Sequence, residues 1–223
     1  MSEIRVPAAG ALLDGDLTVP ADARGVVLFA HGSGSSRLSP RNRRVAAALQ
    51  GLGIGTLLID LLTRDEEAVD ERTSQLRFDI GLLARRLGDI VEWLAARPEV
   101  RPGSVGLFGA STGAAAAAIA AAAHPDIVAA VVSRGGRIDL AGPDVLERLR
   151  APTLLIVGAN DVPVLRLNEA ALGRLAGVRA LAIVPGASHL FEEPGTLDEV
   201  VRLAGMWFGQ YLDGRSFGPK GQS

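Results

Sequence analysis

Six short apolar segments recur along the chain, and stretches with helical spacing lie between them. The first is residues 25–30 (GVVLFA), and the last is residues 179–184 (RALAIV). Short runs that are apolar at nearly every position are typical of parallel strands buried on both faces. Parallel strands need crossover connections, which helices usually supply. The pattern therefore predicts an α/β protein with a mostly parallel central sheet and helices on both faces. The six strands are expected at residues 25–30, 56–60, 104–109, 127–133, 153–158 and 179–184, and the helices at about 41–51, 76–96, 112–123, 143–149, 164–176 and 196–212.

The two ends of the chain differ from this alternating pattern. Residues 3–19 alternate weakly around GD and DG pairs, which predicts an antiparallel pair of strands at the start of the sheet. Residues 213–223 are polar and glycine-rich, which favours a flexible tail. The sequence shows no internal repeat and no linker, so we expect residues 1–212 to form a single domain.

Composition excludes several classes of function. The 223 residues carry a net charge of −2, so no basic field is available for nucleic acid or an anionic membrane. The chain has no cysteine, which excludes disulfides, thiolate zinc sites and a cysteine nucleophile. Neither a signal peptide nor a membrane span of ~18 apolar residues is apparent, so a cytoplasmic location is expected. No ligand-spaced cluster suggests a metal, and no cofactor is expected. The oligomeric state stays open.

A serine lies in a predicted tight turn between a strand and a helix. Residues 109–113 (GASTG) follow a predicted strand, precede a run of alanines, and fit the G-x-S-x-G nucleophile elbow. A serine in so tight a turn needs a positive φ, and small neighbours let the strand and helix cross closely. The free N–H groups at the helix start would favour negative charge beside Ser111. The alternative interpretation is a serine that only caps a helix.

Two further polar residues follow later strands. Asp161 comes just after strand 153–158, and His189 lies in the loop after strand 179–184. The carboxyl ends of parallel strands meet at one edge of a sheet, where ligands bind. The order serine, aspartate, histidine is that of the triad in this kind of hydrolase. We therefore expect Ser111, Asp161 and His189 to act together, although each alone could be an ordinary turn residue.

The loop after the first parallel strand contains Gly32, Ser33 and Gly34. One interpretation is a dinucleotide-binding loop, but Arg37 stands where the third glycine would be needed. The interpretation as a hydrolase loop predicts that a backbone N–H of Ser33 or Gly34 joins the N–H of Thr112 in an oxyanion hole. The neighbouring His31 is then a packing residue.

Several stretches resemble the dienelactone hydrolase-like family of α/β-hydrolases. They are AHGSGSSRLSPRNRRVA, LRFDIGLLARRL, GLFGASTGAAAA, SRGGRIDLAG and PGASHLFEEPG, and the resemblance covers about residues 5–212. The resemblance implies the α/β-hydrolase fold and hydrolysis of small carboxylic esters or lactones through an acyl-enzyme. Enzymes of the family that act on dienelactone are known for a cysteine nucleophile, whereas this chain has a serine. The alternative is a non-catalytic ligand-binding or sensing protein on the same scaffold.

Two arginines and one short connection bear on the substrate. Arg37 and Arg134 lie in loops expected at the rim of the site, where a guanidinium could hold an acidic substrate. The competing interpretation is that both arginines hold loops through carboxylates such as Asp60 or Asp139.

Only residues 134–152 separate two consecutive strands at the position where a cap domain is commonly inserted, so no cap domain is expected.

Overall fold

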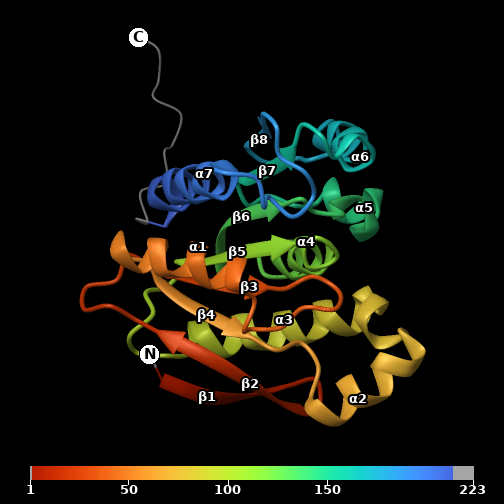
Figure 1. Cartoon of the computed structure of the whole chain (residues 1–223). Helices are drawn as coiled ribbons and strands as arrows, with labels where there is room; N and C mark the ends of the chain where they lie inside the picture. Colours follow the sequence, from red (N-terminus) through yellow and green to blue (C-terminus); the bar gives the residue numbers. More distant parts are fainter. Residues whose placement is uncertain (1, 213–223) are drawn as a thin grey trace.

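An eight-stranded sheet forms the centre of the computed structural model, which describes residues 2–212 (Figure 1). The strand order is β1-β2-β4-β3-β5-β6-β7-β8. β1 and β2 are antiparallel to their neighbours, and the other six strands are parallel to one another. The strands are β1 Ser2–Ala8, β2 Ala11–Thr18, β3 Val26–Ala30, β4 Gly55–Ile59, β5 Val105–Ala110, β6 Val128–Arg134, β7 Thr153–Gly158 and β8 Arg179–Val184. The mostly parallel sheet with an antiparallel N-terminal pair is confirmed, and the expected tail at 213–223 lies outside the described residues.

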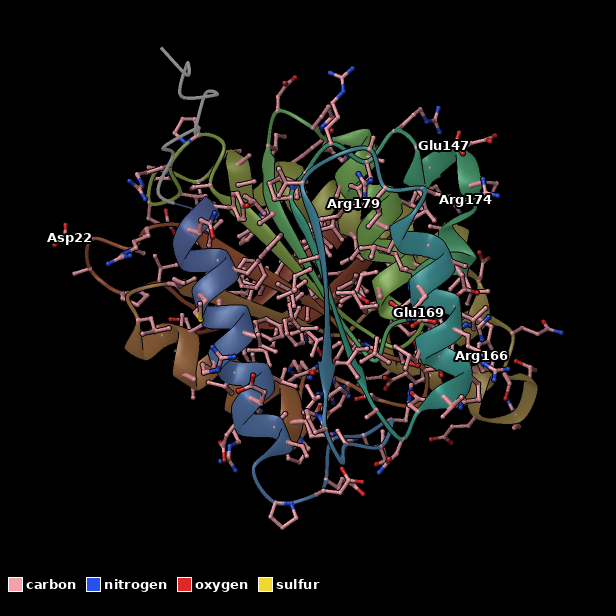
Figure 2. All side chains as sticks on the ribbon, turned by 90° about the horizontal axis from the view of Figure 1, so that it is seen from above. Asp22, Glu147, Arg166, Glu169, Arg174 and Arg179 are labelled. Carbon is pink, nitrogen blue, oxygen red and sulfur yellow. The ribbon has the colours of Figure 1, made fainter. Side chains whose placement is uncertain are left out.

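Helices cover both faces of this sheet. α1 and α7 pack on one face and share a core with Phe29, Phe108 and Val132. α3, α4 and α6 lie on the other face, and Figure 2 shows α6, which carries Arg166 and Glu169, on the opposite side of β8 from α7. The helices are α1 Pro40–Gly51, α2 Arg64–Thr73, α3 Ile80–Ala95, α4 Gly113–Ala123, α5 Pro143–Leu146, α6 Val162–Leu172 and α7 Thr196–Tyr211, with 3₁₀ turns η1 Leu76–Phe78 and η2 Ile138–Ala141.

The alanine-rich helix α4 packs directly under the centre of the sheet. Ala114, Ala115, Ala116, Ala117 and Ala118 are all fully buried. Alanine is the strongest helix former and adds little bulk, so a helix built of it can approach β5 closely. This close packing places the N-terminus of α4 at the carboxyl edge of the sheet.

The sequence pattern missed one helix, α2. Its residues are mostly charged and have no apolar face, which is why hydrophobic periodicity does not reveal it. Its start nevertheless carries a capping box, in which Thr63 and Glu66 bind each other's backbone N–H groups. The expected helix 76–96 likewise begins later, at Ile80, after η1.

The connection between β6 and β7 contains only η2 and α5. Each of these elements has four residues, so no cap domain covers the carboxyl edge of the sheet at this point. Within residues 2–212, no helix combines the length and apolar character needed to cross a bilayer.

Candidate active site

Ser111 occupies a strained turn between β5 and α4. Its φ is 49°, a left-handed conformation that a residue with a Cβ rarely adopts. The turn is tied to the neighbouring strand because the Ser111 N–H donates to the Arg134 carbonyl at 3.3 Å. Close packing around the turn keeps Ser111 in this strained conformation. The turn places Ser111 at the carboxyl edge of the sheet.

Glycines make this close packing possible. A Cβ placed on Gly109 would lie 2.4 Å from the Cα of Ala114, and one on Gly113 would lie 2.3 Å from the carbonyl oxygen of Ala30. Real Cβ atoms do not approach backbone atoms so closely, so both positions require glycine. These are the two glycines of the G-x-S-x-G pattern, and the structure gives each of them a steric reason.

Asp161 and His189 form a direct hydrogen bond at the same edge. The Nδ1 of His189 lies 2.6 Å from Oδ2 of Asp161. The Asp161 side chain is 11 % exposed and the His189 side chain 38 %. A buried carboxylate that accepts from Nδ1–H fixes the tautomer, so the other nitrogen, Nε2, is free to accept a proton.

The backbone at residues 134–135 joins the serine turn to the histidine. The Arg134 carbonyl accepts from Ser111, and a Cβ on the next residue, Gly135, would lie 3.5 Å from His189 Nδ1. The imidazole therefore packs against the same short segment that holds the Ser111 turn. The structure thus brings the three residues expected from their order in the chain to one place.

The loop after β3 packs against the serine turn from the other side. A Cβ on Gly32 would lie 2.9 Å from the Cβ of Ser111. The Ser33 N–H donates to Oγ1 of Thr112 at 3.0 Å, and Gly34 has a φ of 69°. Of the two predicted oxyanion donors in this loop, Ser33 lies against Thr112, and its N–H already has a partner in this arrangement.

His31 serves the loop rather than the reaction. One of its ring nitrogens, Nδ1, lies 2.9 Å from the Gly32 carbonyl, and Nε2 accepts from the Leu61 N–H at 3.1 Å. Burial lowers the pKa of His31, which keeps the ring neutral and able to accept at Nε2. Both ring nitrogens are thus used to connect β3 and β4.

A cavity of about 360 Å³ opens on the far side of the loop from Ser111. Gly32 lies between the two, and Leu61, Leu62 and Leu83 give the cavity an apolar floor. Helix α2 contributes Glu67 to its wall. Sequence reasoning missed this cavity because it missed α2. Its place beside the serine turn makes it the candidate pocket for part of a substrate.

The two rim arginines have different surroundings. The Arg37 N–H binds Oδ1 of Asp60 at 2.7 Å, and its Nη1 binds Oδ2 of the same carboxylate at 2.5 Å. A further carboxylate, that of Asp16, lies 3.7 Å from its Nε. Arg37 thus holds its loop through carboxylates, as the structural interpretation predicted. Arg134 lies buried with Asn42 and has neither Asp60 nor Asp139 as a partner.

No group of three or more histidine, cysteine, aspartate or glutamate side chains in residues 2–212 is arranged to hold a metal ion.

Comparisons with known proteins find similar α/β-hydrolases. The family model of the C-terminal domain of BAAT and acyl-CoA thioester hydrolases matches residues 88–176. The crystal structure of a dienelactone hydrolase from Anabaena variabilis is 56 % identical, covers 94 % of this chain and 97 % of its own, and superposes with a TM-score of 0.91. The structure of Est1E from Butyrivibrio proteoclasticus is 15 % identical with a TM-score of 0.79 over 94 % of this chain and 98 % of its own, a likeness of fold alone.

One relative is named as a transferase and not as a hydrolase. A Mycobacterium tuberculosis protein, named provisionally as a phosphoribosyl transferase, is 55 % identical over 219 residues. That alignment covers 98 % of this chain but 48 % of the relative, so the chain spans about half the length of the curated relatives it matches. With 56 % identity to a dienelactone hydrolase across nearly the full length of both chains, the chain belongs to the dienelactone hydrolase-like family of α/β-hydrolases.

Proposed function

We propose that this chain is a serine hydrolase that cleaves small carboxylic esters or lactones through an acyl-enzyme. The observation that carries the proposal is the 2.6 Å hydrogen bond between Asp161 and His189 beside the strained Ser111 turn. A carboxylate bonded to an imidazole, together with a serine hydroxyl, are the parts of a nucleophilic triad.

In the proposed reaction, Ser111 Oγ attacks the carbonyl carbon of the ester while its proton passes to Nε2 of His189. The protonated imidazole, which is stabilised by Asp161, then donates this proton to the departing alkoxide. Water attacks the acyl-enzyme in the second half of the cycle, and His189 again accepts and returns the proton. The products are a carboxylic acid and an alcohol, or one hydroxy acid where the substrate is a lactone.

The developing oxyanion needs two N–H donors, and Thr112 is the first of them because it follows Ser111 at the start of α4. The second comes from the loop after β3. Gly34 and Ser33 are its two candidates, and Ser33 must first exchange its bond to Oγ1 of Thr112. Both remain candidates for this role.

The nearest alternative substrate class is a thioester, which the matched BAAT and acyl-CoA thioester hydrolase model suggests. The same triad would act on it, with a thiolate in place of the alkoxide. The dinucleotide alternative receives no support from the local geometry, because α1 begins only at Pro40 and its N-terminus is not at Gly32 or Gly34.

The first prediction separates catalysis from ligand binding. A fluorophosphonate probe should label Ser111 and no other serine, since Ser111 stands at a helix N-terminus beside the segment that packs against His189. Peptide mass spectrometry of the labelled protein identifies the site. Labelling of Ser111→Ala at the wild-type level would contradict the assignment, and the absence of any labelling in the wild type would favour the non-catalytic scaffold.

The second prediction concerns chain length. Because no cap domain covers the site after β6, the site is open and offers little enclosed apolar surface to a long acyl chain. Each buried CH₂ contributes about 0.8 kcal/mol only while apolar surface remains to cover it. We expect kcat/KM to rise from p-nitrophenyl acetate to butyrate and then to fall. A continued rise to a chain of about twelve carbons would contradict the open site.

A further inference from the structure

A fully buried asparagine on α6 connects this helix to the loop after β6. Asn168 is 0 % exposed, whereas Arg166 and Glu169 on the same helix are exposed (Figure 2). The Nδ2 of Asn168 donates to the carbonyl of Gly136 at 2.8 Å, and to the carbonyl of Val164 in its own helix at 2.8 Å. The first of these hydrogen bonds joins α6 to the loop.

Stability alone does not account for an asparagine at this position. The Oδ1 of Asn168 is buried without a hydrogen-bond partner, and an unpaired buried polar atom costs free energy. Asparagine is also a weaker helix former than leucine or alanine. A leucine, which has a similar size, would avoid both costs. The bond to Gly136 is therefore the feature that distinguishes the asparagine from an apolar residue in the same place.

The part of the loop that Asn168 binds, residues 134–137, holds Ser111 from both sides. The Ser111 N–H donates to the carbonyl of Arg134 at 3.3 Å, and the Arg137 N–H donates to the carbonyl of Ser111 at 3.0 Å. Because Ser111 is bonded to both ends of the 134–137 segment, a movement of this segment also moves the serine.

The 134–137 segment also contacts the elements that carry Asp161 and His189. Gly135 packs against His189, since a Cβ on Gly135 would lie 3.5 Å from Nδ1 of the imidazole. Asp161 is the N-cap of α6, so the bond from Asn168 to Gly136 links the helix of the aspartate to the segment. All three residues of the proposed triad are thus connected to one short segment, and Asn168 makes the connection from the helix that begins at the aspartate.

We propose that Asn168 is a positioning residue, which keeps Ser111 and His189 in their relative positions by tying α6 to the 134–137 segment. The inference rests on the proposed hydrolase function and adds a residue that is buried away from the reacting atoms. The segment is closely packed, because a Cβ on Gly136 would lie 2.5 Å from the Cβ of Ala114. Without its donor, the carbonyl of Gly136 must find another partner, and the segment shifts. A misplacement of about 1 Å can cost about 100-fold in rate.

The test uses two substitutions that remove this bond and differ in packing. Asn168→Leu fills the space, so its Tm should stay within a few degrees of the wild type, whereas Asn168→Ala leaves a cavity and should lower Tm. Both should lower kcat for p-nitrophenyl acetate by about tenfold to 100-fold and change KM by less than about twofold, because the loss lies in the geometry of the reacting groups and not in substrate binding. Labelling of Ser111 by the fluorophosphonate probe should slow by a similar factor.

Ala171→Gly is the matched control. Ala171 is buried one turn further along α6, and its methyl group makes no hydrogen bond. Glycine weakens the helix, so Tm should fall, while kcat, KM and the labelling rate should match the wild type. A purely structural role for Asn168 predicts another pattern, in which Asn168→Leu keeps its kcat or Ala171→Gly loses as much kcat as Asn168→Ala. Either of these results would overturn the positioning role.

A failure of the proposed function gives a different result. If the wild type hydrolyses no ester and is not labelled, the proposed function is wrong, and amide hydrogen exchange tests whether Asn168 holds the serine turn. The N–H groups of Ser111 and Arg137 should exchange about tenfold faster or more in Asn168→Leu, and at the wild-type rate in Ala171→Gly. Unchanged exchange in Asn168→Leu would show that the bond to Gly136 does not hold the turn, and would overturn the inference.

Discussion

Ser111→Ala and His189→Ala should each lower kcat for a short p-nitrophenyl ester by about 10⁴–10⁶-fold, with little change in KM. The serine supplies the nucleophile and the histidine its base, so both act in the transition state rather than in substrate binding. Asp161→Asn should cost less, about 10⁴-fold. In a fraction of the variant molecules His189 still carries its proton on Nδ1, so its Nε2 can accept the serine proton. Steady-state kinetics with each purified variant measure the three effects.

The double variant Ser111→Ala/His189→Ala provides the internal control. Residues that act as a unit are not additive, so it should be no slower than the slower single variant by more than a small factor. All variants should keep the Tm of the wild type within a few degrees, because His189 is partly exposed and none of the changes enlarges a side chain. Additive losses, or activity retained in Ser111→Ala, would refute the shared role.

Much of the fold could be predicted because its signals are local. The six parallel strands are short apolar runs, and each of them lies within one residue of its expected bounds at either end. The positions of Ser111, Asp161 and His189 just after their strands follow from the same pattern, because parallel strands share one carboxyl edge. Their places after the strands thus predicted one common edge of the sheet for these residues.

Other features depend on contacts that no local pattern contains. Helix α2 has no apolar face, so hydrophobic periodicity does not reveal it, and the pocket wall it provides at Glu67 follows from tertiary packing. The two rim arginines look alike in the sequence. They differ in the structure because Asp60 lies beside Arg37, while Arg134 faces Asn42 and Phe191. Which arginine is neutralised could be learned only from the packed chain.

Gly109→Ala should lower the free energy of unfolding by about 2–4 kcal/mol, an overpacking cost at the upper end of the usual range. Its new Cβ would lie 2.4 Å from Cα and 2.8 Å from N of Ala114, and neither backbone atom can move without shifting α4. At about 2–4 °C for each kcal/mol, Tm should fall by roughly 5–15 °C. Because α4 begins beside Ser111, kcat should fall as well, through displacement of the Thr112 N–H.

Gly209→Ala is the matched control for this change. Gly209 lies in α7, and a Cβ there would meet nothing within 4 Å. Alanine is the better helix former, so this variant should gain up to about 1 kcal/mol and keep its activity. Denaturant unfolding of both variants, with equal m-values, makes the comparison direct. If Gly109→Ala were as stable and as active as Gly209→Ala, the strand and helix would not need their close crossing, and the steric reason for the glycine pattern around Ser111 would be wrong.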